Sequence, residues 1–327
     1  MLDAKHNRSY RYDMNRLTTE QRAQILGLMV EGMAIRAISR QTGASKNTIV
    51  KLLRDAGEAC SEYQDRAMRE LPCKRLQLDE IWSFVGAKEK NVPYERKGLG
   101  IGDVWTWTAI DEETKLVPSW FVGNRDLDHA RAFVMDLKGR LGNRVQITSD
   151  GHKPYVQAVE SAFGDEVDYA MLQKIYAAPS RSPESHRRYS PSPCVGAKRQ
   201  AIIGNPDMSK VSTSHAERMN LNIRMGLRRF TRLTNAFSKK MENHCHALAI
   251  YFMHYNFCRI HQTLRVTPAM AAGVSDKLWD LIDVAKMVDD WEHNRMQAAE
   301  REFGGDTSYA SGHNDPRHHE QRGRTRK

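Results

Sequence analysis

The order of strand-like and helix-like segments between residues 76 and 172 limits the fold more than any other feature of the sequence. Three consecutive segments have the apolar and β-branched character of strands, and a helix, a strand, a helix and a strand follow in turn. This order is typical of a mixed α/β sheet flanked by helices and argues against a barrel or a sandwich. The segments are 76–86, 104–110, 116–122, 127–141, 144–149, 155–163 and 167–172.

The first sixty residues have the pattern of three helices. Thr18 or Thr19 can cap the first, Gly32 ends it, and Gly43 separates the second from a third that Ser45 caps. A short helix, a glycine turn and a basic amphipathic helix are the pattern of a helix-turn-helix, although a three-helix bundle without a ligand is the alternative. Polar side chains at the start of the third helix would reach base edges of DNA. They are Ser45, Lys46, Asn47, Thr48 and Lys51.

Composition divides the rest of the chain. The charged residues of 61–75 predict a linker to the α/β domain, which we expect to occupy 76–235. Several prolines predict a loop over 177–210 within that domain. Helical patterns over 236–303 predict a C-terminal extension, and the polar, basic segment 304–327 predicts a disordered tail.

Charge and apolar content restrict the partners. Fifty Lys and Arg against forty Asp and Glu leave a net charge of +10, which favours nucleic acid over an anionic membrane surface. The longest apolar stretch is too short to span a bilayer, and the N-terminus lacks the apolar core of a signal peptide. We therefore expect a cytoplasmic, nucleoid-associated protein without membrane contact. The five cysteines form no CxxC pair, which argues against a disulfide framework and against a cysteine-based zinc site.

Three acids have unusual surroundings. Asp79 lies within an apolar strand-like segment, Asp150 follows the fourth such segment, and Glu217 opens a helix in a basic region. Pairing of Glu217 with a neighbouring cation is the simple explanation. The alternative is that all three carboxylates bind two Mg²⁺ or Mn²⁺ ions about 3.5–4 Å apart for phosphoryl transfer, while the basic side chains hold DNA. Between residues 210 and 240 those side chains are Lys210, Arg218, Arg224, Arg228, Arg229, Arg232, Lys239 and Lys240.

An aspartate on a strand, a second aspartate after a later strand and a glutamate on a following helix occur in the order of an RNase H-like catalytic core. The motifs around them are Leu78-Asp79-Glu80-Ile81-Trp82-Ser83-Phe84-Val85-Gly86, Thr148-Ser149-Asp150-Gly151-His152-Lys153-Pro154-Tyr155 and Ser214-His215-Ala216-Glu217-Arg218-Met219-Asn220. Residues 76–270 resemble the DDE transposases of bacterial insertion sequences, most closely the insertion-sequence-one group. Further matching residues are 228–232, 237–240, Tyr255, Asn256, Arg259, His261 and Pro268. That group commonly carries a cysteine-rich zinc finger, and no cysteine precedes Cys60 here.

The resemblance implies an RNase H-like domain with Asp79, Asp150 and Glu217 as catalytic metal ligands. Arg224 is similar to the family's basic residue seven positions after the glutamate, and seven residues are about two helical turns, so the two side chains share a face. Glu80 should point to the opposite side of its strand from Asp79 and have a structural role.

The activity that the resemblance implies is metal-dependent cleavage at transposon ends and strand transfer into double-stranded target DNA, performed by at least a dimer on DNA. Two other functions stay open. A non-catalytic helix-turn-helix regulator would bind DNA without metal-dependent nicking. An RNase H-like nuclease would hydrolyse nucleic acid without joining it.

Overall fold

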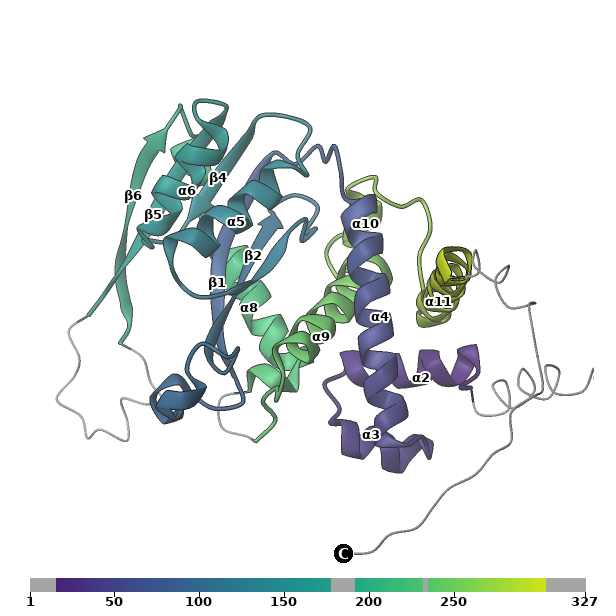
Figure 1. Ribbon diagram of the computed structural model, residues 1–327. Helices are drawn as coiled ribbons and strands as arrows, with labels where there is room; N and C mark the ends of the chain where they lie inside the picture. Colours follow the sequence, from purple (N-terminus) through teal and green to yellow (C-terminus); the bar gives the residue numbers. More distant parts are fainter. Residues whose placement is uncertain (1–15, 178–191, 232–234, 304–327) are drawn as a thin grey trace, which may run out of the picture. The chain divides into compact units, whose positions relative to one another are not determined.

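A single mixed sheet of six strands forms the centre of the computed structural model, which describes residues 16–177, 192–231 and 235–303 (Figure 1). The strand order is β3-β2-β1-β4-β5-β6. β1 pairs with β4 and β4 with β5 in parallel, whereas the other neighbours are antiparallel. The expected mixed α/β sheet is therefore confirmed. The strands are β1 (Arg75–Val85), β2 (Gly102–Asp111), β3 (Trp120–Gly123), β4 (Val145–Ser149), β5 (Val167–Tyr176) and β6 (Cys194–Ile203).

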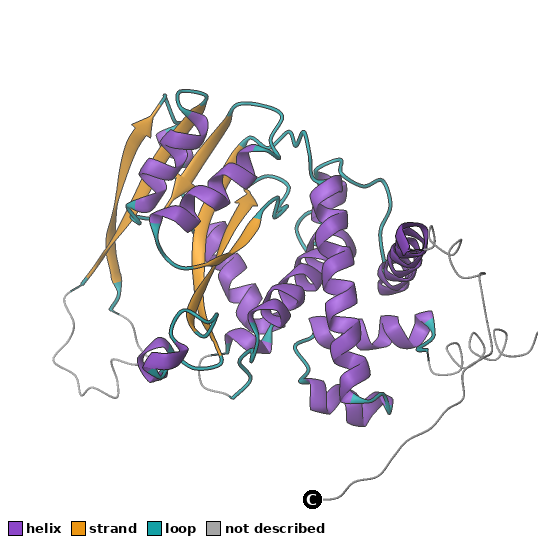
Figure 2. Cartoon of the chain, in the orientation of Figure 1, coloured by secondary structure: helices purple, strands orange, loops and turns teal. Residues whose placement is uncertain are grey.

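Helices flank the sheet, and Figure 2 shows α5 (Leu127–Lys138) and α6 (Pro154–Phe163) against it. The buried Trp107 of β2 contacts Phe133 of α5 and Tyr155 of α6, so these helices cover one face. Asp126 caps α5 by accepting a hydrogen bond from a backbone N–H, and Pro154 begins α6 at a position that needs no N–H donor. The opposite face contacts α8 (Ser214–Gly226).

The three predicted N-terminal helices are present as α2 (Thr19–Val30), α3 (Ile35–Thr42) and α4 (Lys46–Ala67). Thr18 and Gln21 form a capping box at α2, and the Ser45 hydroxyl accepts from the Thr48 N–H at α4. α4 continues through 61–67, so the prediction of a linker is wrong for that part. The reason is tertiary packing, because the buried Gln64 amide donates to the carbonyl of Ala249.

The segment 177–210 is also not simply a loop, because β6 pairs with β5 in an antiparallel register. Pro193 and Pro206 lie outside β6, so its backbone N–H groups are available to the ladder. The prediction of a loop is therefore wrong for β6, while 178–191 lies outside the described residues. β3 begins later than expected because the N–H of Val117, just before Pro118, donates to Asn256 instead of to a strand.

The C-terminal part is helical, as expected, and the predicted tail at 304–327 lies outside the described residues. The described residues up to Val288 form one compact unit, and a second unit begins at Asp289, within the last helix. None of the helices in the described ranges combines the length and apolar character needed to cross a membrane. The remaining elements are η1 (Glu89–Asn91), η2 (Tyr94–Arg96), η3 (Met208–Lys210), η4 (Arg228–Phe230), α9 (Met241–Met253), η5 (His254–Cys258), α10 (Pro268–Ala271) and α11 (Leu281–Phe303).

The close crossing of α4 and α9 depends on Gly57. A Cβ atom at this position would lie 2.4 Å from Cβ and 2.6 Å from Cα of His246. Gly57→Ala is expected to lower the free energy of unfolding by about 1–3 kcal/mol, because a backbone clash forces the helices apart. Gly27→Ala in α2 is the control, since its Cβ would meet only a terminal methyl of Leu281, at 3.1 Å. Urea denaturation of both variants checks this; equal stability of the two would contradict it.

Candidate active site

The sheet register brings the two predicted aspartates together. Leu78 of β1 is the neighbour of Ser149 of β4 in the parallel pairing. Asp79, in the middle of β1, therefore lies beside Asp150, which directly follows the last residue of β4. One carboxylate oxygen each from Asp79, Glu80 and Asp150 lies within 4.8 Å of the others. These three residues are called the acidic cluster below.

Asp79 is half-buried and has two hydrogen-bond donors beside it. Its carboxylate accepts hydrogen bonds from Nδ2 of Asn220, at 2.8 Å, and from the N–H of Glu80, also at 2.8 Å. Burial, together with the nearby charges of Glu80 and Asp150, raises the pKa of Asp79 to about 7. The negative charge of Asp79 is therefore disfavoured at this position.

Glu80 leaves β1 on the other face, as the alternation of a strand predicts. Its side chain, only 2% exposed, accepts from Arg125 at 2.5 Å and from the Tyr155 hydroxyl at 3.1 Å. Burial and the charge of Asp150 raise the pKa of this carboxyl. The end of this long side chain nevertheless reaches the acidic cluster, so the carboxylate of Glu80 lies near those of Asp79 and Asp150.

Glu217 lies in the first turn of α8 and is held away from the cluster by an ion pair. Lys174 of β5 donates to both of its carboxylate oxygens, at 2.5 and 2.6 Å, and the Thr213 hydroxyl donates at 2.7 Å. Glu217 is therefore paired with a cation in this conformation, as the simple explanation predicted. That cation is Lys174 of β5 and not a basic residue near Glu217 in the sequence. Glu217 still lines the same cavity of about 800 Å³ as the acidic cluster.

Cationic and neutral side chains complete this cavity. Arg224 lines it together with Glu217, which is consistent with a shared helix face. Lys153 and Arg125 also line it. The sequence gives weak signals for these contacts: Asn220 follows Glu217 at helical spacing, but nothing marks Arg125 or Lys174.

The donor set fits a divalent cation. Hard ions of this kind take carboxylate and amide oxygens, which the acidic cluster, Glu217 and Asn220 supply. The Oδ1 atom of Asn220 and the Nε2 atom of His152 are buried and have no hydrogen-bond partner within the described part of the chain. Burial lowers the pKa of His152, which keeps the ring neutral. Buried polar atoms without partners are costly, so their presence beside the acids indicates a site for a bound group.

The predicted DNA-binding residues fall into separate places. Ser45, Lys46 and Asn47 are exposed at the start of α4, and Thr48 is half-buried there. Lys51 forms an ion pair with Asp55 at 2.5 Å. Apart from Arg224 in the acidic cavity, the remaining cations lie beyond α8: Arg228, Arg229 and Lys239 line a second cavity, Lys240 is exposed outside it, and Arg232 lies outside the described residues.

Comparison with known proteins finds similarity among solved structures. No family model matches the sequence, and no curated protein is similar to it. Among solved structures, the chain is similar to a piggyBac transposase synaptic complex with hairpin DNA, determined by cryo-EM. The TM-score is 0.42 at 10% sequence identity, and the match covers 92% of this chain and 78% of that chain.

Proposed function

We propose that this chain is a DDE-type transposase, of the kind that bacterial insertion sequences encode, and that it cleaves and joins DNA with Mg²⁺ or Mn²⁺. The observation that carries the proposal is the meeting of Asp79, in the middle of β1, with Asp150, directly after the parallel strand β4, while Glu217 lines the same cavity. Three carboxylates beside cations suit phosphoryl transfer, because the acids hold metal and the cations hold phosphate.

Asp79, Asp150 and Glu217 would hold two ions, with Glu80 beside them. When bound, two such ions activate the attacking oxygen and stabilise the leaving oxygen of an in-line displacement at phosphorus. Arg224 and Lys153 hold the phosphate next to the cleaved bond, and the Asn220 amide fixes the orientation of Asp79.

The reaction has two stages at this one site. Water hydrolyses a phosphodiester at the transposon end and leaves a free 3′-hydroxyl group. That hydroxyl then attacks a phosphodiester of the target, so one bond forms as another breaks and no ATP is needed. Two ends require at least two copies of the chain on DNA, which binds through the first turn of α4 and through the basic side chains. We expect this to occur in the cytoplasm, at the nucleoid.

The test uses the purified full chain and a plasmid that carries its coding sequence with the flanking DNA. With Mg²⁺ or Mn²⁺ we expect nicks at two flanking sites and joined products, and EDTA should remove both. Asp150→Asn should bind the plasmid normally and give neither product. Binding without metal-dependent nicking would overturn the proposal in favour of a DNA-binding regulator. Nicking without joined products would overturn it in favour of a nuclease.

A further inference from the structure

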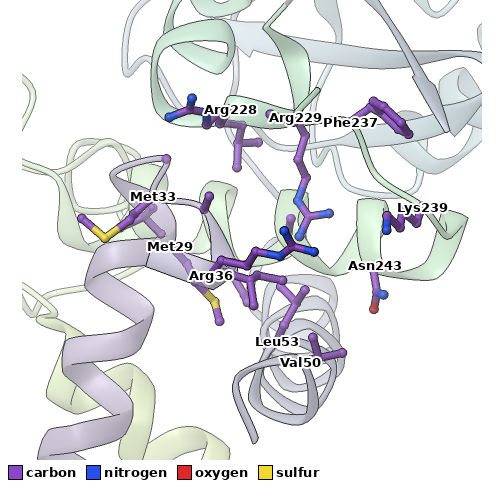
Figure 3. A pocket seen from close by; sticks show the side chains of 18 of the residues that line it. Met29, Met33, Arg36, Val50, Leu53, Arg228, Arg229, Phe237, Lys239 and Asn243 are labelled. Atoms are coloured by element: carbon purple, nitrogen blue, oxygen red, sulfur yellow. The ribbon is translucent and has the colours of Figure 1, made fainter. Parts of the chain in front are cut away.

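A second cavity, of about 360 Å³, lies between the N-terminal helices and the segment that joins α8 to α9 (Figure 3). We call it the arginine cavity, after the four cationic residues Arg36, Arg228, Arg229 and Lys239 in its lining. In Figure 3 the guanidinium ends of Arg36 and Arg229 point into the same part of the cavity, although they come from α3 and η4.

Among the described residues, no acid balances the positive charge of this cavity. No carboxylate is among the described residues that line it, and none of its four cations forms an ion pair with a described acid. Like charges brought together without a counter-charge repel one another and lower stability. The arrangement therefore indicates an anionic ligand.

Arg229 shows this most clearly. Its Nη1 donates to the Ser238 hydroxyl at 2.9 Å, and Ser238 is in turn hydrogen-bonded to Nδ1 of the buried His244 at 3.0 Å. Burial lowers the pKa of Arg229 to about 10, and burial together with Arg229 lowers that of His244 to about 3. Ser238 and His244 are thus neutral. They fix its direction but supply no negative charge.

The rest of the cavity lining is mostly apolar, and a small inorganic anion would leave this apolar surface without a contact. Met29 of α2, Val50 and Leu53 of α4, and Phe237 present hydrocarbon or ring surface, and the Asn243 amide adds a donor and an acceptor (Figure 3). A ligand that joins an anionic group to a flat, mostly apolar body with polar edges matches this lining. A nucleotide has that composition.

We propose that the arginine cavity binds one unstacked nucleotide of DNA, with its phosphate between Arg36 and Arg229 and its sugar and base against the apolar wall. Arginine pairs with phosphate through two parallel hydrogen bonds, and a base gains contact with ring and apolar surface that offsets the loss of stacking. The inference rests on the proposed function, because that function makes DNA the source of the nucleotide. It requires none of the acids of the active site.

The experiment measures binding of thymidine 5′-monophosphate to the full chain in metal-free buffer by equilibrium dialysis. Four single variants divide into two matched pairs. Arg36→Gln is compared with Arg40→Gln, because both residues are exposed on α3 and only Arg36 lines the cavity. Lys239→Gln is compared with Lys240→Gln, because both residues are exposed and only Lys239 lines the cavity.

We expect thymidine monophosphate to bind at least ten times more tightly than inorganic phosphate. Arg36→Gln and Lys239→Gln should each weaken it at least fivefold, whereas Arg40→Gln and Lys240→Gln should stay within twofold of the parent. Equal affinity for inorganic phosphate, equal weakening in both members of a pair, or displacement of the nucleotide by lower concentrations of decanoate would overturn the inference. If the nucleotide binds as expected but the chain does not cleave DNA, that result would count against the proposed function and not against this inference.

Discussion

Asp79→Asn is expected to abolish DNA cleavage and, in metal-free buffer at pH 8, to raise the temperature of unfolding. The carboxyl of Asp79 is buried beside Glu80 and Asp150, and its pKa of about 7 stands well above the ordinary value of 3.8. At pH 8 folding therefore places a charge where it is disfavoured. The shift corresponds to at most about 4 kcal/mol. One carboxylate hydrogen bond is lost in the variant, so we expect a net gain of about 1–3 kcal/mol.

The raised pKa of Asp79 also determines how its contribution to the free energy of unfolding changes with pH. Because the pKa is raised in the folded chain, the folded state keeps a proton that the unfolded state releases between about pH 4 and pH 7. This contribution of Asp79 to stability is complete below that window and is lost as the pH rises through it. The gain from Asp79→Asn should therefore be large at pH 8 and small at pH 4.

Differential scanning fluorimetry with and without Mn²⁺ measures both effects. The parent should gain stability with the metal, because the ion binds only the folded site, whereas Asp79→Asn should respond much less. Asp128→Asn, an exposed acid in the first turn of α5, is the control and should keep the metal response of the parent. If Asp79→Asn were less stable than the parent at pH 8 and kept its full response to Mn²⁺, the metal site would lie elsewhere.

Glu217→Gln is expected to reduce DNA cleavage by about a thousandfold or more, and Glu80→Gln by about tenfold or less. Both glutamates lie near the two aspartates, but their partners differ. Arg125 and Tyr155 already satisfy Glu80 in a buried position, so it has a fixed structural role. Glu217 is bound by Lys174 at a side chain that is 44% exposed, so the carboxylate can exchange that partner for metal. A loss of several kcal/mol in transition-state stabilisation gives the larger factor.

Single-turnover cleavage of the plasmid substrate, at saturating Mn²⁺, separates the two variants. Plasmid binding by each variant provides the control, since neither glutamate belongs to the first turn of α4 or to the arginine cavity. The reverse order of activities would make Glu80 the third metal ligand and Glu217 a partner of Lys174 only.

The positions of the two aspartates could be predicted because they depend on local patterns. An apolar strand with an acid inside it, and a second strand that ends at Asp150, are visible in the sequence. The parallel pairing of β1 with β4, which the structure shows, then places the two aspartates beside each other. The capped helices α2 and α4 likewise follow from Thr18 and Ser45.

Features that depend on distant contacts could not be predicted. The strand β6 is separated from β5 by the undescribed segment 178–191 and exists because β5 offers it an edge. The ion pair of Glu217 involves Lys174, 43 residues away. The grouping of Arg36 with Arg229 needs α3 and η4 to face one cavity. In each case the residues that meet are distant in the sequence, so the repeating pattern of a single helix or strand cannot predict their contact.

The parallel pairing of Leu78 with Ser149 also determines where the chain tolerates changes in length. Insertions between β1 and β2, at residues 86–101, alter a connection outside that pairing and should leave the acids in place. Loss of one residue from β1 before Asp79 would instead exchange the faces of Asp79 and Glu80, because successive side chains alternate. Insertions and deletions are therefore expected in the loops around this site. Within β1 before Asp79, only changes in length by two residues would keep Asp79 on its face of the sheet.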